Sequence, residues 1–206
     1  MILLLKPKNP QIFVVEKYYA SFLGLVNAAC LPWIYFDVDA SIQFVHAIRR
    51  GPTYGNFWKI FHFPLHAALA IGATGLDFLI ENLGKDSLSA FEKLIYPTSL
   101  FSALLLTAII AAFHYSPSSG RGVYSKNIRL LCRALTAVFI LSLNVAFVSI
   151  DLSLIASLGF TTLLVFLQSV LEQYLKEKGR LRVQQQQIQV TVSTPRDQEM
   201  HPIHKD

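Results

Sequence analysis

Two histidines in the second long apolar segment are the residues whose type and spacing most favour chemistry. His62 and His66 lie four residues apart, so on a helix they share one face. Pro64, between them, bends a helix and frees a backbone carbonyl near His62. Histidine changes its charge near neutral pH, and an ionisable group inside a membrane segment is a candidate functional site. We therefore predict an ion or proton path at this pair. The alternative is that His62 lies at headgroup level and His66 hydrogen-bonds a neighbouring helix.

Other ionisable side chains extend this prediction. Asp77 follows His66 by eleven residues, almost three helical turns, so the two point the same way but lie too far apart to share one metal. Asp77 is either a second station on the path or a hydrated carboxylate near the far interface. His114 ends the next apolar segment at the depth of His62, which makes a three-histidine cluster possible. Asp37 and Asp39 are either cation-attracting carboxylates or solvated loop residues.

Composition places these residues in a membrane. Apolar residues make up 53% of the 206 residues, and charged ones only 15%, against about 25% in soluble proteins. Five segments reach the length of about 20 apolar residues that a bilayer-spanning helix needs. Backbone groups in lipid must be paired internally, so all five are predicted to be helices. The fold class is therefore all-α, a multi-pass transmembrane bundle with spans at about 18–36, 58–80, 94–115, 130–150 and 152–174.

Three regions follow from this pattern. Residues 1–17 form an N-terminal segment, residues 18–175 the transmembrane domain, and residues 176–206 a polar, glutamine-rich tail that we expect to be disordered. The fourth and fifth spans are almost directly joined around Asp151, which predicts a tight antiparallel hairpin. Small residues line the second span, which predicts close helix contacts and a place at the centre of the bundle. Aromatic residues near the span ends, Tyr96 among them, predict interfacial belts.

Lysine and arginine counts predict the orientation. With five spans, one side of the membrane carries five basic residues and the other, which includes the tail, carries thirteen. The positive-inside rule then places the tail in the cytosol and the N-terminus outside. The net charge of +5 reflects this distribution between spans, and we expect no nucleic-acid partner. The two cysteines, Cys30 and Cys132, lie in apolar segments, so no disulfide framework is expected.

Two motifs resemble a known family. Residues 33–37 resemble the Trp-x-Tyr-Phe-Asp motif that ends a span in low temperature requirement A proteins, and residues 61–66 resemble the start of the next span in fungal-type relatives. The matching positions are Trp33, Tyr35, Phe36, Asp37, His62, Phe63, Pro64 and His66. Fungal-type relatives usually carry a glutamate where this chain has Thr74. Members are usually about twice as long, so the resemblance implies the C-terminal half of such a protein, a short paralogue or a unit that dimerises.

Three functions stay open. The first is a transporter or channel-like protein that moves a proton or small ion past His62, His66 and Asp77. The second is a membrane scaffold or accessory subunit that binds partners through its tail. The third is an intramembrane metal or haem enzyme that uses the histidines. No Walker loop, dinucleotide fingerprint, Gly-x-Ser-x-Gly or His-Glu-x-x-His motif is present, so we expect no enzyme, cofactor or metal; the expected partners are the bilayer and another copy or missing half.

Overall fold

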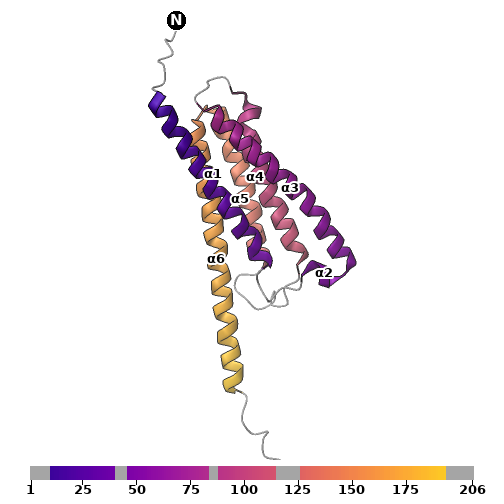
Figure 1. Ribbon diagram of the computed structural model, residues 1–206. Coiled ribbons are helices and arrows are strands. Elements are labelled where there is room, and N and C mark those ends of the chain that lie inside the picture. Colours follow the sequence, from indigo (N-terminus) through magenta and orange to yellow (C-terminus); the bar gives the residue numbers. More distant parts are fainter. Residues whose placement is uncertain (1–9, 40–45, 84–87, 115–125, 194–206) are drawn as a thin grey trace, which may run out of the picture.

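A computed structural model describes residues 10–39, 46–83, 88–114 and 126–193. Within these ranges the regular elements are all helices, which confirms the all-α prediction (Figure 1). The order is α1 (Pro10–Asp39), α2 (Ala47–Arg50), α3 (Pro52–Glu81), α4 (Ala90–Phe113), α5 (Lys126–Ser149) and α6 (Leu154–Ser193). Five of these are long and apolar enough to cross a membrane, as predicted; α2 is a single turn beside the start of α3.

The outer surface of the bundle is apolar. Large side chains that a soluble protein would bury are exposed on every long helix, among them Phe63 at 81%, Phe91 at 76% and Tyr18 at 74%. Such a surface is stable only against an apolar solvent. The chain is therefore a multi-pass integral membrane protein, with α1 and the α6 span running in the same direction and α3, α4 and α5 alternating beside them (Figure 1).

Local sequence signals fix several helix ends. Gly51, with φ of 148°, precedes Pro52, the first residue of α3, where proline is tolerated because its position needs no backbone N–H donor. Ser89 caps α4 in a capping box with Glu92: each side chain accepts a hydrogen bond from the other residue's backbone N–H. Between α5 and α6, Asp151 turns the chain with φ of 52°, a left-handed conformation that aspartate tolerates better than most residues.

The hairpin predicted around Asp151 is present. Residues 150–153 join α5 to α6, and polar side chains then pair along the two antiparallel helices. Asn144 Nδ2 donates to Thr161 Oγ1 at 2.9 Å, and Thr136 Oγ1 donates to Gln168 Oε1 at 2.8 Å. Asn144 thus makes the interhelical hydrogen bond that is usual for an amide inside a span.

The centre of the bundle is α4, and the prediction that the second span lies there is wrong. Buried residues make up 56% of the apolar window of α4, but only 28% of that of α3. The small residues of α3 do allow close contact, but on one side only. A Cβ atom on Gly72 would come within 2.7 Å of Ser99 Oγ, and one on Gly75 within 2.7 Å of Ile95 Cγ2, both on α4. Small residues set how closely two helices approach, whereas the number of neighbours depends on the whole topology.

We expect Gly75→Ala to destabilise the protein by about 1–3 kcal/mol, because the new methyl group has no space between α3 and the β-branched Ile95. Thermal unfolding in detergent would measure the loss. Gly159→Ala in α6 is the matched control, since nothing lies within 4 Å of its Cβ position. The control should be neutral or stabilising by about 0.5–1 kcal/mol, because alanine has the better helix propensity. Equal effects of the two substitutions would contradict the close α3–α4 packing.

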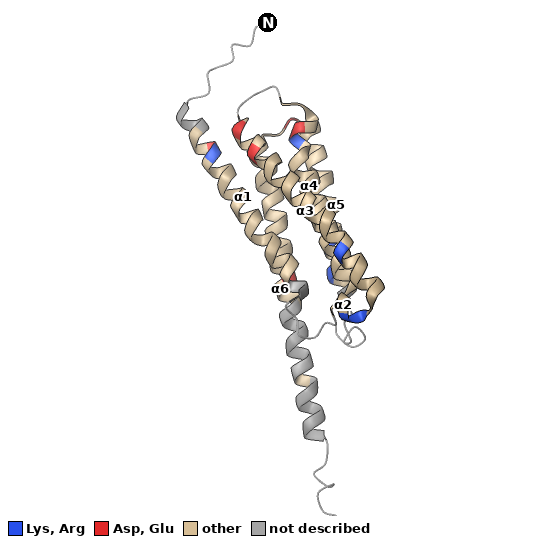
Figure 2. Cartoon of the chain, turned by 45° about the vertical axis from the view of Figure 1, so that its right-hand side comes forward, with Lys and Arg blue, Asp and Glu red and all other residues tan. Residues whose placement is uncertain are grey.

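Charges differ between the two ends of the bundle (Figure 2). The end where α3 stops and α4 starts carries Glu81, Glu92 and Asp151 together with Lys93. At the opposite end, α2 and the start of α3 carry basic residues, including Arg49 and Lys59. Basic residues thus gather at the end of the bundle toward which α6 runs. This is the side for which the sequence predicts the larger number of lysines and arginines.

Asp151 also makes an ion pair that should give the protein a pH-dependent stability. Lys93 Nζ donates to Asp151 Oδ1 at 2.8 Å, and this hydrogen bond, together with the lysine charge, lowers the pKa of Asp151. A carboxylate with a lowered pKa stabilises the fold above its unfolded pKa, and the contribution is lost as the pH falls through the folded value. Asparagine tolerates the left-handed conformation of this turn as aspartate does, so Asp151→Asn removes the charge without straining the backbone. We expect this variant to melt slightly below the wild type at neutral pH and together with it in strong acid; a constant difference would contradict the pair.

The tail differs from its prediction over most of its length. The sequence predicts disorder from residue 176, whereas the backbone of α6 stays helical through Ser193 and extends past the ends of the other helices (Figure 1). The reason lies in the composition, because Lys, Glu, Arg, Leu and Gln are good helix formers and no proline occurs before Pro195. Residues 194–206 lie outside the described ranges.

Candidate functional site

A cavity of about 490 Å³ lies between α1, α3 and α4. Two contacts between the antiparallel helices α1 and α3 bound it. At one end, Gly24 lets α1 approach so closely that an added Cβ would lie 2.5 Å from Leu76 Cδ2. At the other end, Tyr35 hydrogen-bonds His62. Between these contacts α1 packs mainly on α6 and leaves a space beside α3.

His62 makes a hydrogen bond with each of its ring nitrogens. Nδ1 lies 2.6 Å from the carbonyl oxygen of Trp58, one turn earlier on α3, and Nε2 lies 2.6 Å from the Tyr35 hydroxyl. A carbonyl oxygen can only accept, so Nδ1 carries the hydrogen and Nε2 of the neutral ring accepts from the Tyr35 O–H. If the ring takes up a second proton, Nε2 becomes the donor and the Tyr35 oxygen the acceptor. The same hydrogen bond therefore serves both protonation states.

His66 lies one turn further along α3 and lines the cavity. Its ring centroid is 6.2 Å from that of His62, so the two histidines share a face as predicted. No hydrogen bond to His66 is found among the residues that the structure describes. Its ring nitrogens are thus available to a proton, a water molecule or a ligand inside the cavity.

Two more histidines join this end of the site, one of which the sequence analysis overlooked. His114 is buried and packs against His46 with ring centroids 4.8 Å apart, and His46 packs against Trp58 at 4.9 Å. Trp58 in turn lies 4.1 Å from His62. The predicted cluster is therefore present only in part, because His114 reaches His62 through His46 and Trp58. Four histidines and one tryptophan form a continuous row at this end of the bundle.

The inner wall of the cavity carries four polar groups. Asn27 Nδ2 donates to Tyr96 Oη at 2.8 Å and to Thr162 Oγ1 at 2.9 Å, which ties α1 to α4 and α6. Ser99 and Thr107 donate their hydroxyl hydrogens to backbone carbonyls of α4. Tyr96 is only 6% exposed, so its predicted place in an interfacial belt is wrong; its hydroxyl points into the bundle, where Asn27 offers a partner.

The other predicted residues lie around this site. Asp77 is exposed, one residue beyond Leu76 at the far end of the cavity, and no contact between it and a histidine is found in the part of the chain that the structure describes. Of the residues in the two motifs, Tyr35, Phe36 and His66 line the cavity and His62 closes it. Trp33 and Phe63 face outward, and α3 continues through Pro64. The side chains of Asp37 and Asp39 lie outside the described set.

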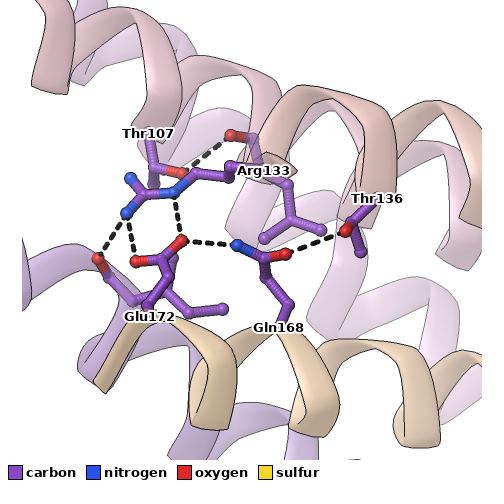
Figure 3. Close-up of polar contacts among 7 residues, drawn as sticks. Thr107, Arg133, Thr136, Gln168 and Glu172 are labelled. Atoms are coloured by element: carbon purple, nitrogen blue, oxygen red, sulfur yellow. Dashed lines mark hydrogen bonds and ion pairs between the residues drawn. The ribbon is translucent and has the colours of Figure 1, made fainter. Parts of the chain in front are cut away.

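A buried ion pair joins three helices behind the site (Figure 3). Arg133 on α5 binds Glu172 on α6 side-on: Nε donates to Oε1 at 2.8 Å and Nη2 donates to Oε2. Nη2 also donates to the Ile34 carbonyl of α1 at 3.2 Å, and Gln168 Nε2 donates to Glu172 Oε1 at 2.7 Å. Both charged side chains are at most 3% exposed. The thirteen basic residues predicted on the tail side include Arg133, which is thus an interior residue.

Sequence reasoning missed Glu172, although a signal was available. Arg133 is the one basic residue in the predicted fourth span, and Glu172 the one acidic residue in the fifth. A tight hairpin around Asp151 places these two positions opposite each other. For His46, by contrast, no such signal exists, because it precedes α3 in a connection whose path the sequence does not define.

The described residues include no group of three or more His, Cys, Asp or Glu side chains with the geometry of a metal site. The histidine row is held by ring packing instead, with rings at steep angles to one another. These contacts pack the rings one against the next along a row, whereas metal ligands converge on one point.

Comparison with known proteins places the chain in a family. A family model described as bacterial low temperature requirement A protein (LtrA) matches residues 9–169, which run from α1 into the membrane span of α6. The chain belongs to the LtrA family. No curated protein and no solved structure matches it. The part of the chain that the LtrA family model matches includes Tyr35, His62, His66 and the whole lining of the cavity. Glu172 lies three residues beyond this part.

Proposed function

We propose that this LtrA-family protein moves protons through its helix bundle, along the cavity between α1, α3 and α4. The observation that carries the proposal is the Tyr35–His62 hydrogen bond, which closes a cavity that is lined by His66. When His62 is doubly protonated, its Nε2–H passes to the Tyr35 oxygen while Tyr35 releases its own hydroxyl hydrogen into the cavity, and a neutral His66 receives that proton there. Asp77 lies beyond the contact of Gly24 with Leu76 at the opposite end of the cavity. We propose it as the next proton-binding group on the path toward the other side of the membrane.

The lining favours a proton over a larger cation. Metal cations such as Na⁺ or Ca²⁺ are usually held by several oxygen ligands that include carboxylates. None of the residues that line the cavity is Asp or Glu. Its ionisable groups are instead a histidine and two tyrosines, which exchange protons and hold hard cations poorly. We also propose, from the positive-inside rule and the basic end of the bundle, that the α6 tail is cytosolic.

Proton flux into liposomes tests the function. Purified protein in liposomes should dissipate a pH gradient when the membrane potential is clamped, and His66→Phe should abolish the protein-dependent flux, because phenylalanine keeps the ring but cannot carry a proton. Ala70→Phe is the matched control: it places the same side chain one turn away on α3, outside the cavity lining. Unchanged flux in His66→Phe would refute the role of His66.

A second candidate function rests on the long C-terminal helix. We propose as the alternative that the protein is a membrane scaffold or accessory subunit, because α6 extends as a single helix past the bundle to Ser193 and offers a rigid element outside the membrane (Figure 1). Deletion of residues 176–206 should then remove its binding partners while the spans remain folded. Identical partners in a pull-down with and without the tail would count against this function.

The finer resemblance to fungal-type relatives, and to the C-terminal half of a longer member, is also part of the proposal. It is supported by the two family motifs, one with Tyr35 and one with His62, because a hydrogen bond between these two residues joins the motifs in the fold. Under this proposal a second copy or further spans complete the bundle. Cross-linking in native membranes should then trap an oligomer or reveal a longer chain, and a monomer of 23.1 kDa alone would contradict it.

A further inference from the structure

We infer that the cavity binds an uncharged, lipid-soluble molecule with one hydroxyl or carbonyl group, which enters sideways from the bilayer between α1 and α3. The role of this molecule as a cargo coupled to protons rests on the proposed function. Its binding does not, because binding requires only the cavity. The inference depends on three features of the cavity: its mouth, its lining and its inner wall.

The mouth of the cavity faces lipid. Four small or apolar lining residues are exposed on the outer surface between α1 and α3: Ala28, Pro32, Leu69 and Ala73. They lie inside the candidate spans Val14–Phe36 and Pro52–Glu81, with Pro32 about one turn from the end of its span and the other three farther from either end. An opening at this depth leads to the acyl chains of the bilayer. A molecule that reaches it is already dissolved in the membrane.

The lining excludes charged ligands. The 19 residues that line the cavity include no Asp, Glu, Lys or Arg. A buried ammonium group on the ligand would then lack a partner of opposite charge, and a carboxylate would find one only while His66 is protonated. Pockets of about 300–1,000 Å³ with mostly apolar walls are typical of small organic ligands, and this cavity of about 490 Å³ falls in that range.

The inner wall offers hydrogen bonds to one polar group. Tyr96 Oη accepts from Asn27, and its own hydrogen has no acceptor among the described residues. Asn27 Oδ1 is buried on the same wall and accepts no hydrogen bond from the described residues. One donor and one acceptor at the back of an apolar cavity match a hydroxyl group, and the donor alone matches a carbonyl.

Photolabelling tests the inference. The probe is a medium-chain alcohol with a diazirine in its chain, added to the full-length protein in lipid nanodiscs, and mass spectrometry locates the adducts. We expect adducts on residues 28–36 and 65–76 that an excess of unlabelled alcohol removes. Ala73→Phe should lower this labelling about fivefold or more by filling the cavity. Ala70→Phe, on the outer face of the same helix, should leave it within about twofold of the wild type.

Two further experiments test the polar contact and the preference for uncharged molecules. Tyr96→Phe should weaken competition by the alcohol several-fold but leave competition by an alkane of equal length unchanged, a result that does not depend on how Ala73→Phe folds. Diazirine analogues with a carboxylate or an ammonium group should label the cavity weakly. Labelling that cannot be competed, that is equal in Ala73→Phe, or that is as strong with the charged analogues would overturn the inference. The proton-flux result has no bearing on these outcomes.

Discussion

Glu172→Leu is expected to destabilise the bundle by about 3–5 kcal/mol, because it leaves the guanidinium of Arg133 buried without its carboxylate. The loss is large for two reasons. Both side chains are almost fully enclosed, and the same contact connects α5, α6 and the Ile34 carbonyl of α1 (Figure 3). Unfolding of the purified protein in mixed micelles of mild detergent and SDS would measure the difference in free energy.

The double variant separates the pair from its environment. When Arg133→Met is added to Glu172→Leu, no charged side chain stays buried among the described residues, and most of the lost stability should return, since apolar residues often replace a buried ion pair at little cost. Glu81→Leu, an exposed carboxylate at the end of α3, is the control and should change stability little. A Glu172→Leu variant as stable as the wild type, or a double variant less stable than Glu172→Leu, would contradict the buried ion pair.

Tyr35→Phe is expected to slow proton flux about tenfold or more while the protein stays folded, because it removes the hydroxyl that links His62 to the cavity. The aromatic ring, which packs against the rings of Phe36 and His62, remains. The expected result is thus a defect in transfer and not in assembly. Flux into liposomes at equal protein content, with the melting temperature measured on the same preparations, distinguishes the two.

Tyr18→Phe provides the matched control for this variant. It removes the same hydroxyl from the same helix, but at a position that is 74% exposed near the start of α1. Flux through this control should equal that of the wild type. Equal slowing in both variants would show that the effect is general to α1 and would remove Tyr35 from the proposed path.

Much of the architecture is predictable from the sequence because the bilayer imposes simple rules. Long apolar segments must be helices, and a connection as short as that around Asp151 must form a hairpin. The pairing of His62 with His66 follows in the same way from their spacing on one helix. Each of these predictions depends only on residues that are close in the sequence.

Contacts between distant segments are less predictable. The central position of α4 and the burial of Tyr96 depend on which helices are neighbours, and hydrophobicity does not encode this in a membrane, where lipid and helix surfaces are equally apolar. The meeting of Tyr35 with His62 depends on the same choice of neighbours. The continuation of α6 to Ser193 shows a different limit: the polar composition of this segment predicts disorder, although the same residues are good helix formers.

The most direct test of the central claim is the proton permeability of liposomes that contain the purified wild-type protein and no other. With the membrane potential clamped, an imposed pH gradient should decay faster than in protein-free liposomes, in proportion to the amount of protein, and the His62→Phe/His66→Phe double variant should restore the protein-free rate. Decay at the protein-free rate with the wild type, or equal decay with the double variant, would contradict the proposal that this bundle moves protons past His62 and His66.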